Sequence, residues 1–168
     1  ALTPRTRLLS LSAVQFLSGY RADLREIGAL CRSRGVVFVV DGIQAVGAVP
    51  LDVQAMQIDA LAAGAQKWQM APLGTGFLYV TEALQERIQP QYAGWLSVAS
   101  PWDFRLLDQP LARSARRYEG GTLNIPGMYG MRESLAILEE YGQTAVAAQI
   151  HGLTEILMQD LSAIPGLR

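Results

Sequence analysis

Short apolar runs alternate with a helical pattern at the start of the chain. Residues 7–16 are an apolar run with interspersed serines, which is typical of a strand covered on both faces. Residues 22–34 then place apolar side chains at helical spacing, and Gly35 ends the pattern. Residues 36–41 are a second apolar run that ends on a carboxylate. Strand, helix and strand in this order predict a βαβ unit with a right-handed crossover, and hence a parallel sheet.

Two further strands and a short helix are expected before residue 90. One helical turn is expected at residues 51–56, followed by a strand at residues 58–63. A proline and glycine turn then leads into an apolar strand at residues 76–80. Residues 83–88 form a short helix in this prediction, and Pro90 ends it.

The pattern of residues in the second half of the chain predicts a long loop and two helices. Residues 91–119 carry scattered aromatic side chains and prolines without a sustained period, which is typical of a long functional loop. Residues 125–141 and 144–161 show helical spacing, with Gly142 between them. Because two helices with apolar faces need a covering element, we expect the chain to be a fragment that stops before a second domain.

Composition favours one globular domain and excludes two classes of partner. Half of the 168 residues are hydrophobic, which is enough for a single core. The formal net charge is −1, so neither a nucleic-acid partner nor an anionic membrane surface is expected. No apolar run approaches the roughly 20 residues that a membrane span needs. The single cysteine, Cys31, excludes an intramolecular disulfide and fits a reducing compartment, so we expect a cytoplasmic location.

A carboxylate and an amine follow two of the predicted strands. Asp41 ends the apolar run at residues 36–40, and Lys67 follows the small side chains of residues 62–65. Ligands collect at the carboxyl ends of parallel strands, so we expect both groups to be buried and to face one crevice. On composition alone, Lys67 equally fits an exposed lysine at a strand end, and Asp41 fits a turn or helix cap.

The chemistry of this pair points to one cofactor. Burial lowers the pKa of an amine, which suits a lysine to form a Schiff base with an aldehyde. A carboxylate pairs with a protonated pyridine nitrogen. Both requirements together point to pyridoxal phosphate, a cofactor that carries an aldehyde on a pyridine ring.

Several segments together resemble the class V aminotransferase family, and they occur in the family's order. They are residues 40–47, 50–53, 58–59, 67–68, 72–80, 94–95 and 118–124. The family contains cysteine desulfurases, selenocysteine lyases and isopenicillin N epimerase-like proteins, which are pyridoxal-phosphate enzymes of fold type I. The resemblance spans most of the chain, and the combined motifs are specific.

The resemblance implies an α/β fold with three layers, α/β/α, around a mostly parallel sheet. Residues 1–125 would be the C-terminal part of the large cofactor-binding domain, and residues 126–168 the helices that lead to a missing small domain. In the family, the histidine stacked on the cofactor ring and a phosphate loop precede the strand at Leu8. The arginine that binds the substrate carboxylate follows Arg168, so this polypeptide alone can be catalytically incompetent.

Three residues are implied to act on the cofactor ring. Lys67 would carry the cofactor as a Schiff base and then move the α proton of the substrate. Asp41 would pair with the pyridine nitrogen, which makes the ring an electron sink, and Gln44 would contact its phenolic oxygen.

Three other residues are implied to bind the cofactor phosphate. In the family, Gly121 and Thr122 serve the phosphate of the neighbouring subunit, so the resemblance implies a homodimer with a shared active site. Gln66 stands where relatives often have a histidine, and its amide still donates a hydrogen bond. Without the resemblance, the Gly121 segment fits an ordinary turn.

The implied substrate is an amino acid, and the reaction remains open. Transamination, β-elimination of sulfur or selenium, and epimerisation begin with the same Schiff base. The segments at residues 94–95 and 118–124 resemble the epimerase and selenocysteine lyase side of the family. One rival hypothesis is a truncated, non-catalytic α/β scaffold or assembly fragment. A second, a nucleotide-binding domain, requires a glycine-rich turn after the first strand, which residues 18–20 do not supply.

Four remaining residues have structural interpretations. His151 is expected to be solvated or capping, and Cys31 to be a small core residue. Trp95 and Tyr92 either form a wall of the substrate cavity or pack as ordinary aromatic side chains. No set of metal ligands is among the candidates.

Overall fold

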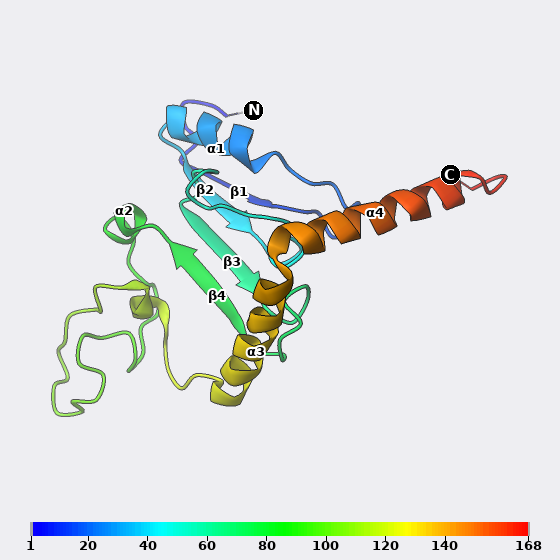
Figure 1. Ribbon diagram of the computed structural model, residues 1–168. Coiled ribbons are helices and arrows are strands. Elements are labelled where there is room, and N and C mark those ends of the chain that lie inside the picture. Colours follow the sequence, from blue (N-terminus) through cyan, green and yellow to red (C-terminus); the bar gives the residue numbers. More distant parts are fainter. Residues whose placement is uncertain (1, 168) are drawn as a thin grey trace.

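The computed structural model describes residues 2–167 and contains one mixed sheet (Figure 1). Its strands lie in the order β1 (Leu8–Ser12), β2 (Val37–Asp41), β3 (Ala60–Gly64) and β4 (Gly76–Val80). β1 pairs with β2 and β2 with β3 in parallel, whereas β4 runs antiparallel to β3. The predicted α/β class and mostly parallel sheet are confirmed.

Helix α1 (Leu24–Ser33) connects the two parallel strands β1 and β2, as the βαβ prediction requires. The Asp23 side chain caps its first turn by accepting a hydrogen bond from the Glu26 N–H. Leu24 and Cys31 are buried on its inner side, against the sheet. The strand predicted at residues 7–16 is shorter than expected, because the chain turns at residues 15–19.

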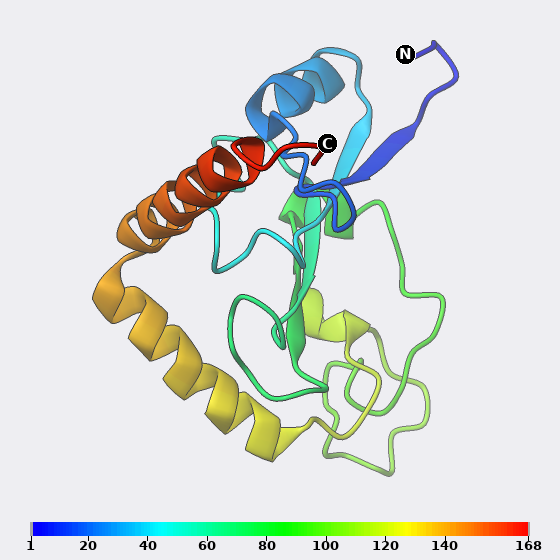
Figure 2. The same ribbon diagram turned by 90° about the vertical axis from the view of Figure 1, so that its right-hand side faces the viewer.

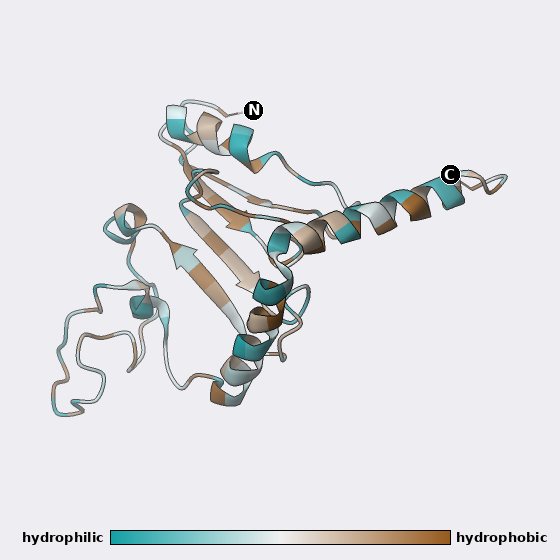
Figure 3. Cartoon of the chain, viewed as in Figure 1, coloured by the Kyte–Doolittle hydropathy of each residue, from teal (hydrophilic) through white to brown (hydrophobic). Residues whose placement is uncertain are grey.

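The main core lies between α1 and one face of the sheet. Phe38 and Val40 of β2 and Leu61 of β3 are completely or almost completely buried there. Figure 3 shows the apolar character of the central strands as brown ribbon. Since side chains alternate across a strand, residues 37, 39 and 41 point to the opposite face.

Among residues 2–167, that opposite face, here called the open face, is covered only at one end. Val37, Ala60 and Val80 pack there with Leu84 of α2 (Glu82–Gln85). Toward the carboxyl ends of β2 and β3 the face carries small residues, and Ala62 is exposed. The ends of the parallel strands therefore leave accessible space above the sheet.

Two long helices follow, close to their predicted bounds. α3 spans Ile125–Tyr141 and α4 spans Gln143–Ser162. The Asn124 side chain caps α3 by accepting a hydrogen bond from the Gly127 N–H. Gly142 alone joins the two helices, with a φ of 80° that favours glycine. Figure 2 shows both helices on the side of the sheet opposite the long loop.

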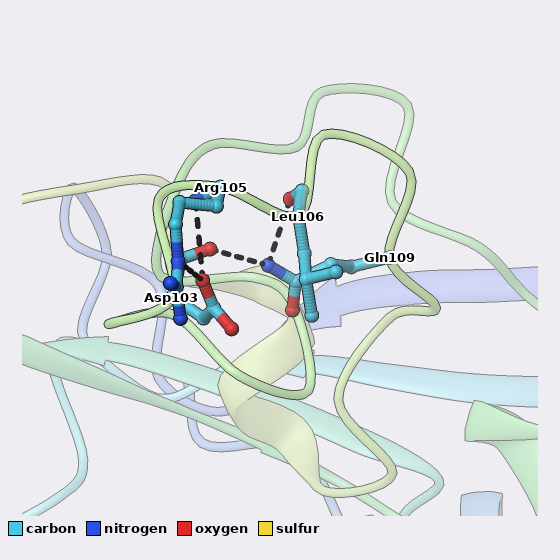
Figure 4. A network of polar contacts seen from close by, with 4 residues as sticks. All are labelled: Asp103, Arg105, Leu106 and Gln109. Atoms are coloured by element: carbon cyan, nitrogen blue, oxygen red, sulfur yellow. Dashed lines mark hydrogen bonds and ion pairs between the residues drawn. The ribbon is translucent and has the colours of Figure 1, made fainter.

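The long loop predicted at residues 91–119 has one short helix, η1 (Ala115–Tyr118), near its end. Its outer part is held by local polar contacts (Figure 4). The Gln109 amide nitrogen donates to the carbonyls of Asp103 and Leu106, and the Arg105 N–H donates to the Asp103 carboxylate. The loop is therefore irregular but ordered. Within residues 2–167, no helix is both long and apolar enough to cross a membrane.

The buried thiol of Cys31 gives a first testable prediction. Burial and, second, the nearby Asp59 carboxylate raise the pKa of this thiol above its ordinary value of 9.0. Because the unfolded thiol ionises at lower pH than the folded one, the free energy of unfolding should fall as the pH rises above the ordinary value. Urea unfolding below and above that pH measures the effect. The comparison is Cys31→Ala, and an equal pH dependence in both proteins would contradict the prediction.

Candidate active site at the carboxyl edge of the sheet

Asp41 is the last residue of β2, and its position in the strand places its side chain on the open face. One carboxylate oxygen accepts a hydrogen bond of 3.0 Å from the Ile43 N–H, and the other accepts one of 3.3 Å from the Ser12 hydroxyl. These two contacts fix the orientation of the carboxylate. Asp41 is exposed, so the prediction of a buried acid is wrong for this chain. The reason is that no described element lies over this end of the open face, where Ala62, beside Asp41 in β3, is exposed as well.

Lys67 lies just beyond β3, at the same edge of the sheet as Asp41. Its loop is closed by backbone hydrogen bonds from Ala65 N–H to the Thr75 carbonyl and from Ala71 N–H to the Ala65 carbonyl. The Lys67 carbonyl accepts a bond from the Met70 N–H. The side chain of Lys67 is exposed, so the prediction of a buried amine is also wrong. Within residues 2–167 this amine forms no ion pair with a carboxylate.

The parallel pairing of β2 and β3 brings the two segments to one edge. Asp41 pairs with Ala62, and the Gly42 N–H donates a hydrogen bond of 2.8 Å to the Ala62 carbonyl. Lys67 follows the end of β3 by three residues, after Gly64. The predicted placement of both groups after neighbouring strands is thus confirmed at the level of the backbone, and their chemical roles stay predictions.

The two candidate glutamines lie in the turns that follow β2 and β3. Gln44 is partly buried in a turn that is closed by the Ala45 N–H donating to the Gly42 carbonyl. Gln66 is exposed, and its amide folds back over Gly64. A Cβ on Gly64 would lie 2.5 Å from the Gln66 side-chain oxygen. Since residue 64 points to the open face, the Gln66 amide lies on the same face as the Asp41 carboxylate.

Gly121 and Thr122 are in a different part of the molecule, between η1 and α3. Thr122 is exposed, and Gly121 lies beside the indole of Trp95. Among the described residues, no hydrogen bond of Thr122 or Gly121 reaches Asp41, Gln44 or Lys67. This separation is compatible with the prediction that the pair serves a second copy of the chain, which remains untested.

Two further features were not singled out from the sequence, one at this edge and one in the long loop. Lys67 is the only lysine among 168 residues, since all other basic side chains are arginines or His151. That signal is visible in the sequence without any structure. The other feature is Ser97, whose complete burial depends on contacts with residues far along the chain. Its surroundings in the sequence carry no comparable sign.

The residues at the edge form a suitable donor set for pyridoxal phosphate. An oriented carboxylate, a primary amine and two amides lie after neighbouring strands, beside an open face floored by small residues. A carboxylate can pair with the pyridinium nitrogen of the cofactor, and an amine can react with its aldehyde. Small residues on the sheet leave space for its flat ring. The residues present fit this group.

Comparison with known proteins supports the same assignment. The Aminotransferase class-V family profile matches residues 1–168. A probable cysteine desulfurase of Methanothermobacter thermautotrophicus is 32% identical over 171 residues, covering 99% of this chain and 41% of that protein. YcbU of Bacillus subtilis, an uncharacterized aminotransferase, is 29% identical over 141 residues, covering 84% of this chain and 37% of that protein.

Solved structures agree with the sequence matches. The cystine C–S lyase C-DES, in complex with its product cysteine persulfide, superposes with a TM-score of 0.90 at 30% identity, over 98% of this chain and 44% of its own. A C-DES mutant holds glycine covalently linked to its PLP cofactor. The cysteine desulfurase CsdA of Escherichia coli gives a TM-score of 0.85 at 28% identity, over 98% of this chain and 40% of its own.

The chain spans about two fifths of the length of these relatives. The matched part includes the four-stranded, mostly parallel sheet and the segments that follow β2 and β3. The resemblance inferred from the sequence motifs is confirmed. The match over the whole sequence shows that the chain belongs to the aminotransferase class-V family, with cysteine desulfurase-like proteins among its relatives.

Proposed function

We propose that this chain forms the cofactor-binding part of a pyridoxal-phosphate enzyme that acts on an amino acid. The observation that carries the proposal is the placement of Asp41 at the end of β2 and of Lys67 just beyond β3, two paired parallel strands, at one edge of the sheet. The family membership and the PLP cofactor of the solved C-DES mutant add support. Both names of relatives, desulfurase and aminotransferase, fit an enzyme of this kind.

In this proposal each residue has a defined task. Asp41, oriented by Ser12 and Ile43, holds the protonated ring nitrogen. The bound cofactor supplies an electron sink for negative charge at the substrate α carbon. The amine of Lys67 attaches the cofactor and, once free, takes up and returns the α proton at its Nζ atom.

The amides have positioning tasks in the same proposal. Gln44 donates from the turn after β2 to the phenolic oxygen of the ring, and Gln66 donates toward the phosphate. Neither amide carries a charge, so both orient the cofactor through hydrogen bonds alone. The fate of the substrate side chain stays open among transamination, elimination of sulfur or selenium, and epimerisation.

The assembly proposed with this function is a homodimer of the complete enzyme. Gly121 and Thr122 would then complete the phosphate site of the partner, since they lie apart from Lys67 in one chain. The three-layer arrangement is proposed for the same complete enzyme, in which additional chain covers the open face. That covering would also bury Asp41 and Lys67, which the sequence pattern predicted. A cytoplasmic location belongs to the same proposal.

The rival proposal is a non-catalytic fragment, and one observation favours it. Both reactive side chains are exposed, and the open face above them is uncovered within residues 2–167. An exposed amine attaches a small aldehyde only weakly and without a specific site. The two proposals therefore differ in whether the isolated chain selects the cofactor.

Titration with pyridoxal phosphate distinguishes the two proposals. We expect a saturable absorbance band of the covalent link to Lys67, because the carboxylate and amides orient the aldehyde beside the amine. Borohydride should fix the link, and peptide mapping should place it on Lys67 rather than on the terminal amine. Saturation at one site supports the enzyme proposal. Equal, unsaturable labelling of both amines in folded protein would support the rival.

A further inference from the structure

Ser97 is completely buried although it lies in the long loop between α2 and η1. Its hydroxyl accepts a hydrogen bond of 3.0 Å from the Gly94 N–H and donates one of 2.7 Å to the Glu119 carbonyl. The second bond joins residues 22 positions apart in the sequence. A buried hydroxyl is costly unless it is hydrogen-bonded, and here it uses both its donor and its acceptor capacity.

The backbone of Ser97 strengthens the same junction. Its N–H donates to the Gly94 carbonyl, and its carbonyl accepts from the Ala112 N–H at 2.8 Å. Gly94 in turn lies directly against Gly120, where a Cβ on Gly94 would overlap the Gly120 carbonyl. The turn at residues 94–97 is therefore fixed against the segment at residues 119–122, which we call the glycine segment.

This junction also sets the position of Trp95. A Cβ on Gly121 would lie 3.5 Å from the indole nitrogen of Trp95, so the N–H edge of the indole faces the glycine segment. Trp102 packs edge-on against Trp95 with ring centroids 5.1 Å apart, which further restrains the indole. The indole N–H is a donor only, and it stands beside the backbone of Gly121.

We propose that Ser97 is a positioning residue that holds the glycine segment in the conformation that binds a phosphate ester. Through the turn at residues 94–97 it also aligns the indole N–H of Trp95 with the backbone of Gly121 as an additional phosphate donor. The inference rests on the proposed function, since the phosphate ester is that of pyridoxal phosphate. It adds two residues, Ser97 and Trp95, to the phosphate site expected at Gly121 and Thr122.

The phosphate group itself provides the test. Pyridoxal and pyridoxal phosphate share the ring and the aldehyde, so the ratio of their affinities isolates the contribution of the phosphate site. We expect the native chain, as a dimer in which the glycine segment of one copy serves the cofactor on Lys67 of the other, to prefer pyridoxal phosphate. We expect Ser97→Ala to reduce that preference about tenfold, which corresponds to the loss of about one hydrogen bond to the charged phosphate. The affinity for pyridoxal should change less than about twofold. The preference should return in Ser97→Thr, which keeps the hydroxyl.

A purely structural role of Ser97 predicts a different result. In that case Ser97→Ala weakens the binding of pyridoxal and of pyridoxal phosphate equally. The ratio of the two affinities then stays that of the native chain, which would overturn the inference. Ser33→Ala is the matched control, because it removes a serine hydroxyl that bonds only to the nearby Leu30 carbonyl in α1. This control should leave the ratio unchanged.

A second measurement does not depend on Lys67. Inorganic phosphate is titrated into the protein while the amide resonances of Gly121 and Thr122 and the indole resonance of Trp95 are recorded. Shifts in the native chain that weaken in Ser97→Ala support the inference, even if no link forms at Lys67 and the proposed function fails. The absence of these shifts overturns the inference, even if pyridoxal phosphate attaches to Lys67.

Discussion

Lys67→Arg should abolish the borohydride-fixed attachment of pyridoxal phosphate to a side chain. The guanidinium of arginine keeps the positive charge but offers no nucleophilic amine, because it stays protonated at all ordinary pH values. No other side chain can substitute, since the sequence contains no second lysine. The expected result is complete loss of the labelled peptide, measured by mass spectrometry after reduction.

A relocated lysine is the control for this experiment. Arg113→Lys, combined with Lys67→Arg, restores one lysine at an exposed position of the long loop while the net charge stays the same. We expect no saturable link in this double variant, because Arg113 does not follow β3. Both exposed substitutions should change the free energy of unfolding by less than about 0.5 kcal/mol. Saturable labelling of the relocated lysine would show that attachment does not depend on the site.

Phe38→Ala should produce the largest loss of stability. Phe38 is 0% exposed, and its ring fills the core between β2 and α1. Removing a fully buried phenyl ring costs transfer free energy and leaves a cavity, so we expect a loss of about 3–5 kcal/mol. Since domains are only marginally stable, the variant should be largely unfolded at moderate temperature. Urea unfolding followed by circular dichroism measures the change.

Phe77→Ala is the matched variant on the same sheet. Phe77 belongs to β4 and is 39% exposed, so its ring gives up less apolar contact on truncation. We expect it to lose less than half of the free energy lost by Phe38→Ala. Equal losses in the two variants would contradict the expectation that the loss follows the buried area of the ring.

The sequence predicted the elements well wherever periodicity decides them. The bounds of α3 agree with the prediction. β2 ends at Asp41 as expected, because its apolar run ends at a single carboxylate, and it begins one residue later than expected. The strand predicted at residues 7–16 extends too far, since the turn at residues 15–19 is stabilised by backbone bonds such as Gly19 N–H to the Gln15 carbonyl. A turn of that kind leaves little trace in hydrophobic periodicity.

The candidate site was predictable in position but not in burial. Asp41 and Lys67 follow strands that pair in parallel, and parallel pairing aligns their carboxyl ends. Whether a strand end is covered depends on distant segments, and no described element lies over Ala62. The burial of Ser97 could not be predicted from the local sequence either, because it arises from a contact with the distant Glu119. Such long-range packing is not encoded in local pattern.

Gly142 makes α4 a lever arm. α4 contains 20 residues and extends away from the sheet from this single glycine (Figure 1). At 1.5 Å per residue its length is about 30 Å, so an angular change of about 10° at Gly142 displaces its far end by about 5 Å. A small change of the backbone angles at Gly142 thus moves the outer half of α4 by several times the shift at the glycine itself. Replacing Gly142 with a residue that disfavours positive φ would reset the direction of the whole arm.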